Sequence, residues 1–196
     1  MQIAVVTGNP KPASRTHGVA LALADLLATE LAHPGAAGSE SARPGAPGSE
    51  SAGSESAGSE PQAPLVVDLA EHAASLFDWS DAELSRLTAE VAAADLAIFA
   101  SPTYKAAYTG MLKAFLDRYG SNGLAGTVAV PVMTGGWPGH LLAVEVHLRP
   151  VLVELGATVP ARGLYVTEPE LATLDAPLKK WAESAVALIR RALPPE

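Results

Sequence analysis

The chain has 196 residues, 48% of them hydrophobic and 17% charged, with a formal net charge of −8 and no cysteine. This length predicts one domain over residues 1–196. The charge disfavours nucleic acid as a partner, and the missing cysteine excludes disulfides and thiolate metal ligands. No apolar run reaches the roughly 18–20 residues that cross a bilayer, and the chain opens directly on the apolar run 3–6, so we expect a cytoplasmic protein without a membrane partner.

Short apolar runs alternate with amphipathic stretches along the chain. The apolar runs predict strands near residues 2–7, 65–68, 95–100, 126–132 and 160–166. The amphipathic stretches predict helices near residues 15–32, 81–93, 109–119, 140–155 and 176–193. Such alternation predicts an α/β, flavodoxin-like three-layer sandwich: a five-stranded parallel sheet of order 2-1-3-4-5 with helices on both faces. In that topology the loops after the first, third and fourth strands meet at the ligand-binding edge.

The loop after the first strand, residues 7–16, leads into a helix start suited to an anion. Gly8 permits a tight exit from the strand, and Ser14 is placed to cap the following helix. Free N–H groups at a helix start attract anions, and Arg15 can add a two-pronged contact. A phosphate monoester is the natural occupant. The alternative is a rigid turn whose prolines and cap only start a helix.

A low-complexity insertion occupies residues 34–64. It has no Val, Ile, Leu, Met or aromatic residue, and Gly-Ser-Glu recurs in it four times. Nothing in such a stretch can offset the entropy of ordering, so we expect a disordered surface loop. It is either a neutral expansion between two elements or a tether that docks a partner.

The loop after the third strand, residues 100–110, reads Ala-Ser-Pro-Thr-Tyr-Lys-Ala-Ala-Tyr-Thr-Gly. Pro102 fixes its own φ and keeps Ser101 out of the helical region, so the chain leaves the sheet edge in one direction. This exposes backbone N–H groups and the flat ring of Tyr104. A planar, hydrogen-bonding heterocycle fits such a loop better than a sugar, a metal or a peptide, and flavin is the first candidate.

The loop after the fourth strand, residues 133–140, contains paired glycines. Gly135 and Gly136 let the backbone approach a ring closely, and Thr134 or a main-chain N–H can meet the pyrimidine edge of a flavin. His140 is expected to open the next helix, where a neutral, hydrogen-bonding or purely structural histidine is favoured over a catalytic acid. The spacing of the other histidines suggests no metal site.

The predicted helix 140–155 carries more apolar side chains than one sheet face needs: Leu141, Leu142, Val144, Leu148, Val151, Leu152 and Leu155. Pro150 is expected to kink it. Together with Met111 and Phe115 on the preceding helix, this surface predicts a homodimer. The alternative is a helix buried within one subunit.

Two motifs, Ser101–Lys113 and Thr134-Gly135-Gly136 followed by His140–Val144, occur in order at characteristic spacings. With them the chain resembles the NADPH-dependent FMN reductases over Gln2 to about Glu168, most closely those that supply reduced flavin to two-component alkanesulfonate-type monooxygenases. The resemblance implies a flavodoxin-like fold, reduction of FMN by NADPH or NADH, a flavin-dependent monooxygenase as a possible partner, and a homodimer or homotetramer.

The resemblance also implies roles for individual residues. The FMN phosphate is assigned to Ser14, Arg15 and Thr16, with Asn9 and Pro10 lining the loop. The isoalloxazine and ribityl chain are assigned to Pro102, Thr103, Tyr104 and Lys105, and the other side to Thr134, Gly135 and Gly136. Trp137-Pro138-Gly139 departs from the small and polar residues expected there, which affects the depth of the pocket and the choice of nicotinamide.

Tyr108 falls where the sulfonate-linked members of the family carry an extra tyrosine in a locally widened helix at the subunit interface. That feature is associated with releasing flavin instead of keeping it. The alternative is a tyrosine that packs on a neighbouring helix.

The sequence shows no acid, base or nucleophile set, so we expect no catalytic residue in the usual sense. Hydride passes directly from nicotinamide to flavin N5, and the protein has to stack and position the rings. Two other functions stay open: a reductase of quinones, azo dyes or metal oxyanions that retains FMN, and a non-enzymatic electron carrier like a flavodoxin.

Overall fold

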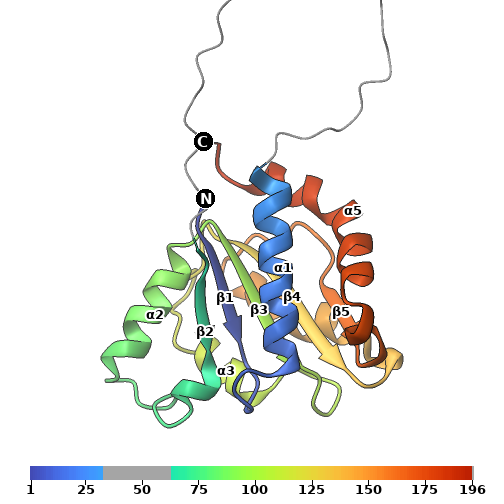
Figure 1. Cartoon of the computed structure of the whole chain (residues 1–196). Helices are drawn as coiled ribbons and strands as arrows, with labels where there is room; N and C mark the ends of the chain where they lie inside the picture. Colours follow the sequence, from blue (N-terminus) through green and yellow to red (C-terminus); the bar gives the residue numbers. More distant parts are fainter. Residues whose placement is uncertain (33–62, 196) are drawn as a thin grey trace, which may run out of the picture.

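The computed structural model describes residues 1–32 and 63–195. Its five strands are all parallel and lie in the order β2-β1-β3-β4-β5, which confirms the predicted sheet (Figure 1). Their bounds are β1 Ile3–Thr7, β2 Leu65–Asp68, β3 Leu96–Pro102, β4 Val128–Gly135 and β5 Leu164–Thr167. The insertion predicted at 34–64 lies outside the described residues except for its last two positions.

The helices cover both faces of the sheet. Helices α1 (Arg15–Ala32) and α5 (Asp175–Ala192) pack against each other on one face (Figure 1). The other face carries α2 (Ala82–Ala92), α3 (Gly110–Leu116) and α4 (Arg149–Glu154). Short helical turns join them: η1 Leu69–His72, η2 Pro138–His140, η3 Val144–Leu148 and η4 Pro169–Thr173. Every helix in the described part of the chain is too short or too polar to cross a membrane.

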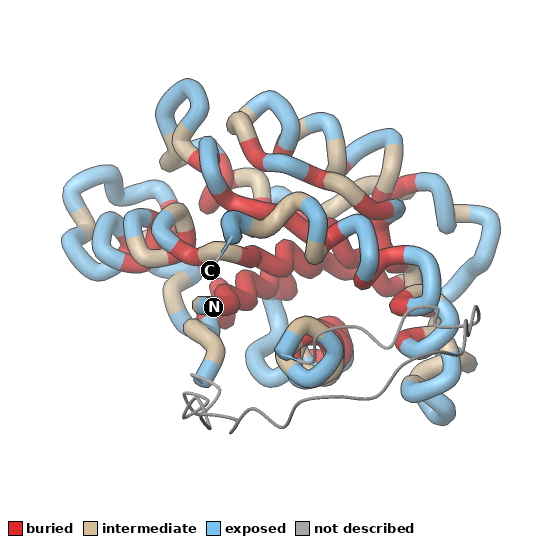
Figure 2. Tube along the Cα trace, turned by 90° about the horizontal axis from the view of Figure 1, so that it is seen from above, coloured by how far each residue is buried: buried red, intermediate tan, exposed pale blue. Residues whose placement is uncertain are grey.

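The sheet divides the core into two. Along β1, Ala4 and Val6 point to the face covered by α2, α3 and α4, whereas Ile3 and Val5 point to the face covered by α1 and α5. All four are buried, because β1 lies inside a parallel sheet that helices cover on both faces. Figure 2 shows this as a buried layer running between exposed outer helices.

The sequence predicts one kinked helix over residues 140–155, and this prediction is wrong. The segment passes through a turn into the π-helical η3 and only then into α4. In η3 the N–H of Arg149 reaches the carbonyl of Val144, one residue further than in an α-helix. Pro150 follows directly and has no N–H to give, and the guanidinium of Arg149 donates to the carbonyls of Val159 and Ala161 at 2.6 and 2.7 Å. These bonds hold the widened turn against the strand-5 side of the sheet.

The expected interface side chains divide between core and surface. Phe115, which the sequence places at an interface, is fully buried, and so are Val144, Leu148 and Leu152. Their hydrophobic face belongs to the subunit's own core, as the alternative interpretation holds. The apolar side chains exposed along the same stretch are Leu141, Leu142, Val146 and Val153.

The pairing register brings three loops to one edge of the sheet. Thr7 at the end of β1 lies opposite Ala100 in β3, and Pro102 at the end of β3 pairs with Thr134 in β4. These strand ends form the lower edge of the sheet in Figure 1. From β1 the chain runs through α1 on one face of the sheet to β2, whereas from β3 it runs through α3 on the other face to β4. The edge between β1 and β3 is therefore the switch point, where open α/β sheets bind ligands.

Candidate functional site

The loop between β1 and α1 is held by its own polar groups. The Ser14 hydroxyl accepts the N–H of His17 at 3.2 Å and caps α1, as predicted. This leaves the N–H groups of the first helical turn, at Arg15 and Thr16, for another acceptor. Asn9 turns the loop by accepting the N–H of Lys11 at 3.0 Å. The helix start is therefore preorganised.

Asp68, at the end of β2, fixes this loop from the neighbouring strand. Its carboxylate accepts the N–H of Ala13 at 2.9 Å, and Ala13 has a φ of +46°. His17 lies beside it, with Nδ1 4.0 Å from the carboxylate and 3.1 Å from the Thr7 hydroxyl. Sequence reasoning assigned neither Asp68 nor His17 a role. One signal for Asp68 was available, because it is the last residue of the predicted strand 65–68, and the predicted strand order places that strand beside the first strand.

Thr16 links the first loop to the third. Its hydroxyl lies 2.7 Å from that of Thr134 and accepts the side-chain N–H of Asn9 at 3.3 Å. All three side chains are buried. Thr16 and Thr134 are thus brought together as predicted, but their hydroxyls bond each other. Toward an anion, Thr16 offers its main-chain N–H.

Arg15 lies at the surface of the same edge. Its side chain is 70% exposed and pairs with the carboxylate of Glu168, which is 51% exposed, at 2.7 Å. Glu168 follows β5 directly, and its N–H donates to the carbonyl of Gly135 at 2.9 Å. No local pattern marks Glu168, because 153 positions separate it from Arg15.

Thr109 joins the first and second loops. Its hydroxyl donates to the carbonyl of Gly8 at 2.5 Å and accepts the N–H of Leu112 at 3.1 Å, which caps α3. Its own N–H donates to the Ser101 hydroxyl at 2.9 Å. The buried hydroxyls of Ser101 and Thr109 therefore fix where the Pro102 loop leaves β3 and where it returns.

The tip of the second loop is a tight turn from Tyr104 to Ala107. The N–H and carbonyl groups of these two residues bond each other at 2.9 and 3.1 Å. Lys105 and Ala106 between them both have positive φ, at 53° and 64°, a conformation that costs a non-glycine residue about 1 kcal/mol or more. The turn presents Tyr104 at the surface, where 53% of the residue is exposed.

Thr103 sits where this loop meets the loop after β4. Its N–H donates to the carbonyl of Thr134 at 2.7 Å. Its hydroxyl is buried and has no hydrogen-bond partner among the described residues. A buried hydroxyl without a partner is costly, so this group is available to a ligand at the edge of the sheet.

Tyr108 lies in the loop before α3, ahead of the capping residue Thr109. The widened helix that the resemblance implied at this tyrosine is therefore wrong in position. Within residues 1–32 and 63–195 the π-helical turn is Val144–Leu148, where the sequence has no tyrosine. Tyr108 packs partly buried against the core cluster of the α2, α3 and α4 face, which is the alternative interpretation.

The loop after β4 combines close backbone packing with an exposed aromatic ring. A Cβ on Gly135 would lie 2.1 Å from the hydroxyl of Tyr165, so any other residue there would displace that side chain. That hydroxyl donates to the carbonyl of Trp137 at 3.1 Å. The Trp137 ring lies edge-to-face with His140, their centroids 5.0 Å apart. His140 ends the turn η2 and does not open a helix, which corrects the expected position.

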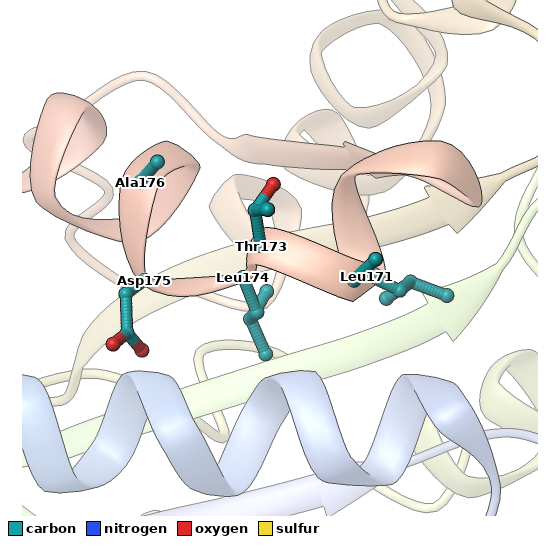
Figure 3. Close-up of a pocket in the computed structure, with 6 residues that line it drawn as sticks. Leu171, Thr173, Leu174, Asp175 and Ala176 are labelled. Carbon is teal, nitrogen blue, oxygen red and sulfur yellow. The ribbon is translucent and has the colours of Figure 1, made fainter.

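Other parts of the described surface offer less. A depression lined by Leu171–Ala176 lies between β5 and α5, where Leu174 points toward α1 and Thr173 away from it (Figure 3). It brings together no set of polar groups from different strands. Among the described residues, no three His, Asp or Glu side chains are grouped to hold a metal ion.

Comparisons with known proteins point to one family. The model of a family described as NADPH-dependent FMN reductase matches residues 1–170. An FMN reductase (NADPH) of Escherichia coli K12 is 41% identical over 88 residues, 45% of this chain and 46% of the relative. The chain thus matches about half the length of that relative. The NADH-dependent FMN reductase SfnF of Pseudomonas putida is 27% identical over 85% of this chain and 77% of its own.

Among solved structures, the apo form of an NADH:FMN oxidoreductase (EMOB) superposes with a TM-score of 0.74. It is 25% identical, and the alignment covers 100% of this chain and 91% of that one. The family model and this solved structure therefore both indicate relatives that act on FMN.

Proposed function

The chain belongs to the NADPH-dependent FMN reductase family, and from that premise we propose that it reduces FMN with a hydride from NADPH or NADH. One observation carries the proposal: the loops after β1, β3 and β4 are bonded to one another at the switch point. Thr109 donates to Gly8, Thr103 donates to Thr134, and Thr16 bonds Thr134. They form one preorganised rim from three strands.

The residues of this rim suit FMN. The first turn of α1 and the guanidinium of Arg15 offer donors for a phosphate group, and no metal is needed to hold it. The unpartnered hydroxyl of Thr103 and the exposed ring of Tyr104 offer a hydrogen bond and a stacking surface for a flat ring. Gly135 lets the loop after β4 pack closely against Tyr165 on the other side. Asn9, Pro10, Pro102, Lys105 and Gly136 complete the assigned set.

The protein's part in the reaction is placement. Bound FMN supplies the hydride acceptor, and the nicotinamide supplies the hydride. The chain holds the flavin phosphate at Ser14 and Arg15 and the ring against the loop 102–105, so that one face stays open to the nicotinamide. Holding two rings in contact removes the entropy cost of their encounter, so no acid or base at the rim is required.

The test is an assay of nicotinamide oxidation by the purified protein with added flavin. We expect the rate of NADPH or NADH oxidation to rise with added FMN and then to level off. The rate is measured as the loss of nicotinamide absorbance. FMN that stays bound through dialysis would favour a reductase of quinones, azo dyes or metal oxyanions. A flavin that dithionite reduces but neither nicotinamide does would favour an electron carrier. A protein that binds no flavin would end the proposal.

Reduced FMN, in our proposal, leaves this protein and serves a flavin-dependent monooxygenase. The exposure of both Arg15 and Tyr104 supports this, because a flavin held there stays open to solvent and exchanges readily. The resemblance to reductases of two-component systems points the same way.

We also propose that two copies pair through the surface of η3, α3 and α4. Leu142 and Val146 are 54% and 58% exposed there. A groove lies between α3 and α4, lined by Lys113, Leu116, Asp117, Pro150, Val151, Glu154 and Leu155. Neighbouring exposed apolar side chains beside an apolar groove are typical of an interface.

Val146→Asp tests this surface. A charge buried in an apolar contact is costly, so we expect dimer affinity to fall at least about tenfold. Light scattering after size exclusion would show the mass moving from dimer to monomer. Leu188→Glu is the matched control, because Leu188 is 42% exposed on α5, on the opposite face of the sheet. A wild-type monomer at all concentrations contradicts the interface.

A further inference from the structure

The ion pair between Arg15 and Glu168 joins two ends of the candidate site. Arg15 follows the capping residue of α1, where we place the phosphate, and Glu168 follows β5. The carboxylate lies 2.7 Å from the guanidinium and beside Gly136, where a Cβ would be 3.8 Å from it. The carboxylate of Glu168 is therefore already paired with the guanidinium of Arg15, which a phosphate would need as its partner.

We infer that Glu168 lowers the preference of the site for phosphorylated flavin over riboflavin, by competing with the phosphate for Arg15. This inference rests on the proposed function. In it, Glu168 weakens FMN binding and leaves riboflavin, which has no phosphate, unaffected. The result is a flavin held loosely enough to exchange as a substrate.

The pair is built to open. Both side chains are largely exposed, and an exposed ion pair contributes little to folding, because water and salt screen it. The backbone of Glu168 is fixed instead, by the bond from its N–H to Gly135 and by the N–H of Leu171, which donates to its carbonyl at 3.3 Å. The side chain can swing away while the loop keeps its place.

The charges decide the direction of the effect. FMN carries a doubly charged phosphate near neutral pH, and it has to displace one carboxylate from one guanidinium. The free energy of FMN binding is reduced by the free energy needed to break the pair between Arg15 and Glu168. The carboxylate of Glu168 also repels the phosphate as long as it stays near. Lys11 and Lys105 are the other cationic side chains on these loops, and in the described part of the chain neither forms an ion pair with Glu168 that would relieve that cost.

The experiment measures FMN and riboflavin affinities by the quenching of flavin fluorescence. The proteins are the wild type, Glu168→Gln, Arg15→Ala and the double variant. Because an exposed pair is worth up to about 1 kcal/mol, we expect Glu168→Gln to tighten FMN binding about two- to fivefold. Riboflavin affinity should stay the same, and most of the FMN gain should disappear in the Arg15→Ala background. Glu183→Gln, halfway along α5, is the control for removing one negative charge.

The outcomes separate the two proposals. Unchanged FMN affinity in Glu168→Gln overturns the inference and leaves the reductase function standing. So does an equal gain for riboflavin, or an equal gain in the Arg15→Ala background, because either shows an effect that does not pass through the phosphate and Arg15. A wild-type protein that binds neither flavin overturns the proposed function and this inference with it.

Discussion

Gly8→Ala is expected to destabilise the protein by about 3 kcal/mol, because the new Cβ has nowhere to go. It would lie 2.4 Å from the Cβ of Leu112 and 2.9 Å from its Cα, so the obstacle includes backbone and no side chain can rotate aside. Either α3 or the first loop must move. Either movement breaks the bond from Thr109 to the Gly8 carbonyl, so FMN affinity should fall as well. Urea denaturation followed by circular dichroism measures the first effect, and flavin titration the second.

Gly18→Ala is the matched control, and it should have the opposite sign. Gly18 lies inside α1 with nothing within 4 Å of an added Cβ. Alanine there lowers the entropy of the unfolded chain and should stabilise the protein by about 0.5–1 kcal/mol. Equal stability of the Gly8→Ala variant and the wild type would show that the first loop and α3 are not in the close contact described.

Arg15→Ala is expected to lower FMN affinity about tenfold, since a hydrogen bond to a charged group is worth about 1.5 kcal/mol even with solvent nearby. Riboflavin affinity should change little, because riboflavin has no phosphate for Arg15 to meet. Turnover at saturating FMN should also change little, because we assign Arg15 to the phosphate and not to the flavin ring. Titrations with both flavins and an assay at saturating FMN measure the three quantities.

Arg15→Lys is the control that separates charge from geometry. Lysine keeps the positive charge and loses the two-pronged donor, so its FMN affinity should lie between those of the wild type and Arg15→Ala. An equal loss for FMN and riboflavin in Arg15→Ala would remove the phosphate from this end of the site.

Most of the secondary structure was predictable from the sequence. The strand starting at Leu65 was predicted with its observed bounds, and β1, β3 and β4 were predicted within a few residues of theirs. Such runs are long, apolar and separated by clear helical periods, so local pattern decides them. The prediction of a single helix over 140–155 was wrong. Arg149 in this segment bonds the carbonyls of Val159 and Ala161, which lie beyond it, so the local pattern does not reveal these contacts.

The candidate site was predictable in its loops and less so in its contacts. The cap at Ser14 is local, so the sequence was enough for it. Asp68 reaches Ala13 across 55 positions, so its place at the end of a predicted strand was a signal for Asp68, but no local pattern identifies Ala13 as its partner. Phe115 was expected at an interface because its apolarity is visible in the sequence, whereas the direction of its side chain is not.

By itself, the sequence determined the fold class, the strand order and the three loops that meet at the switch point, because apolar period and turn residues act over short distances. Only the tertiary structure decided which charged groups face each other there. The pairing of Arg15 with Glu168 depends on how β5 lies beside β4 and on where α1 begins. Such contacts join distant positions of the chain, and their energies exist only once the sheet has brought the strand ends together.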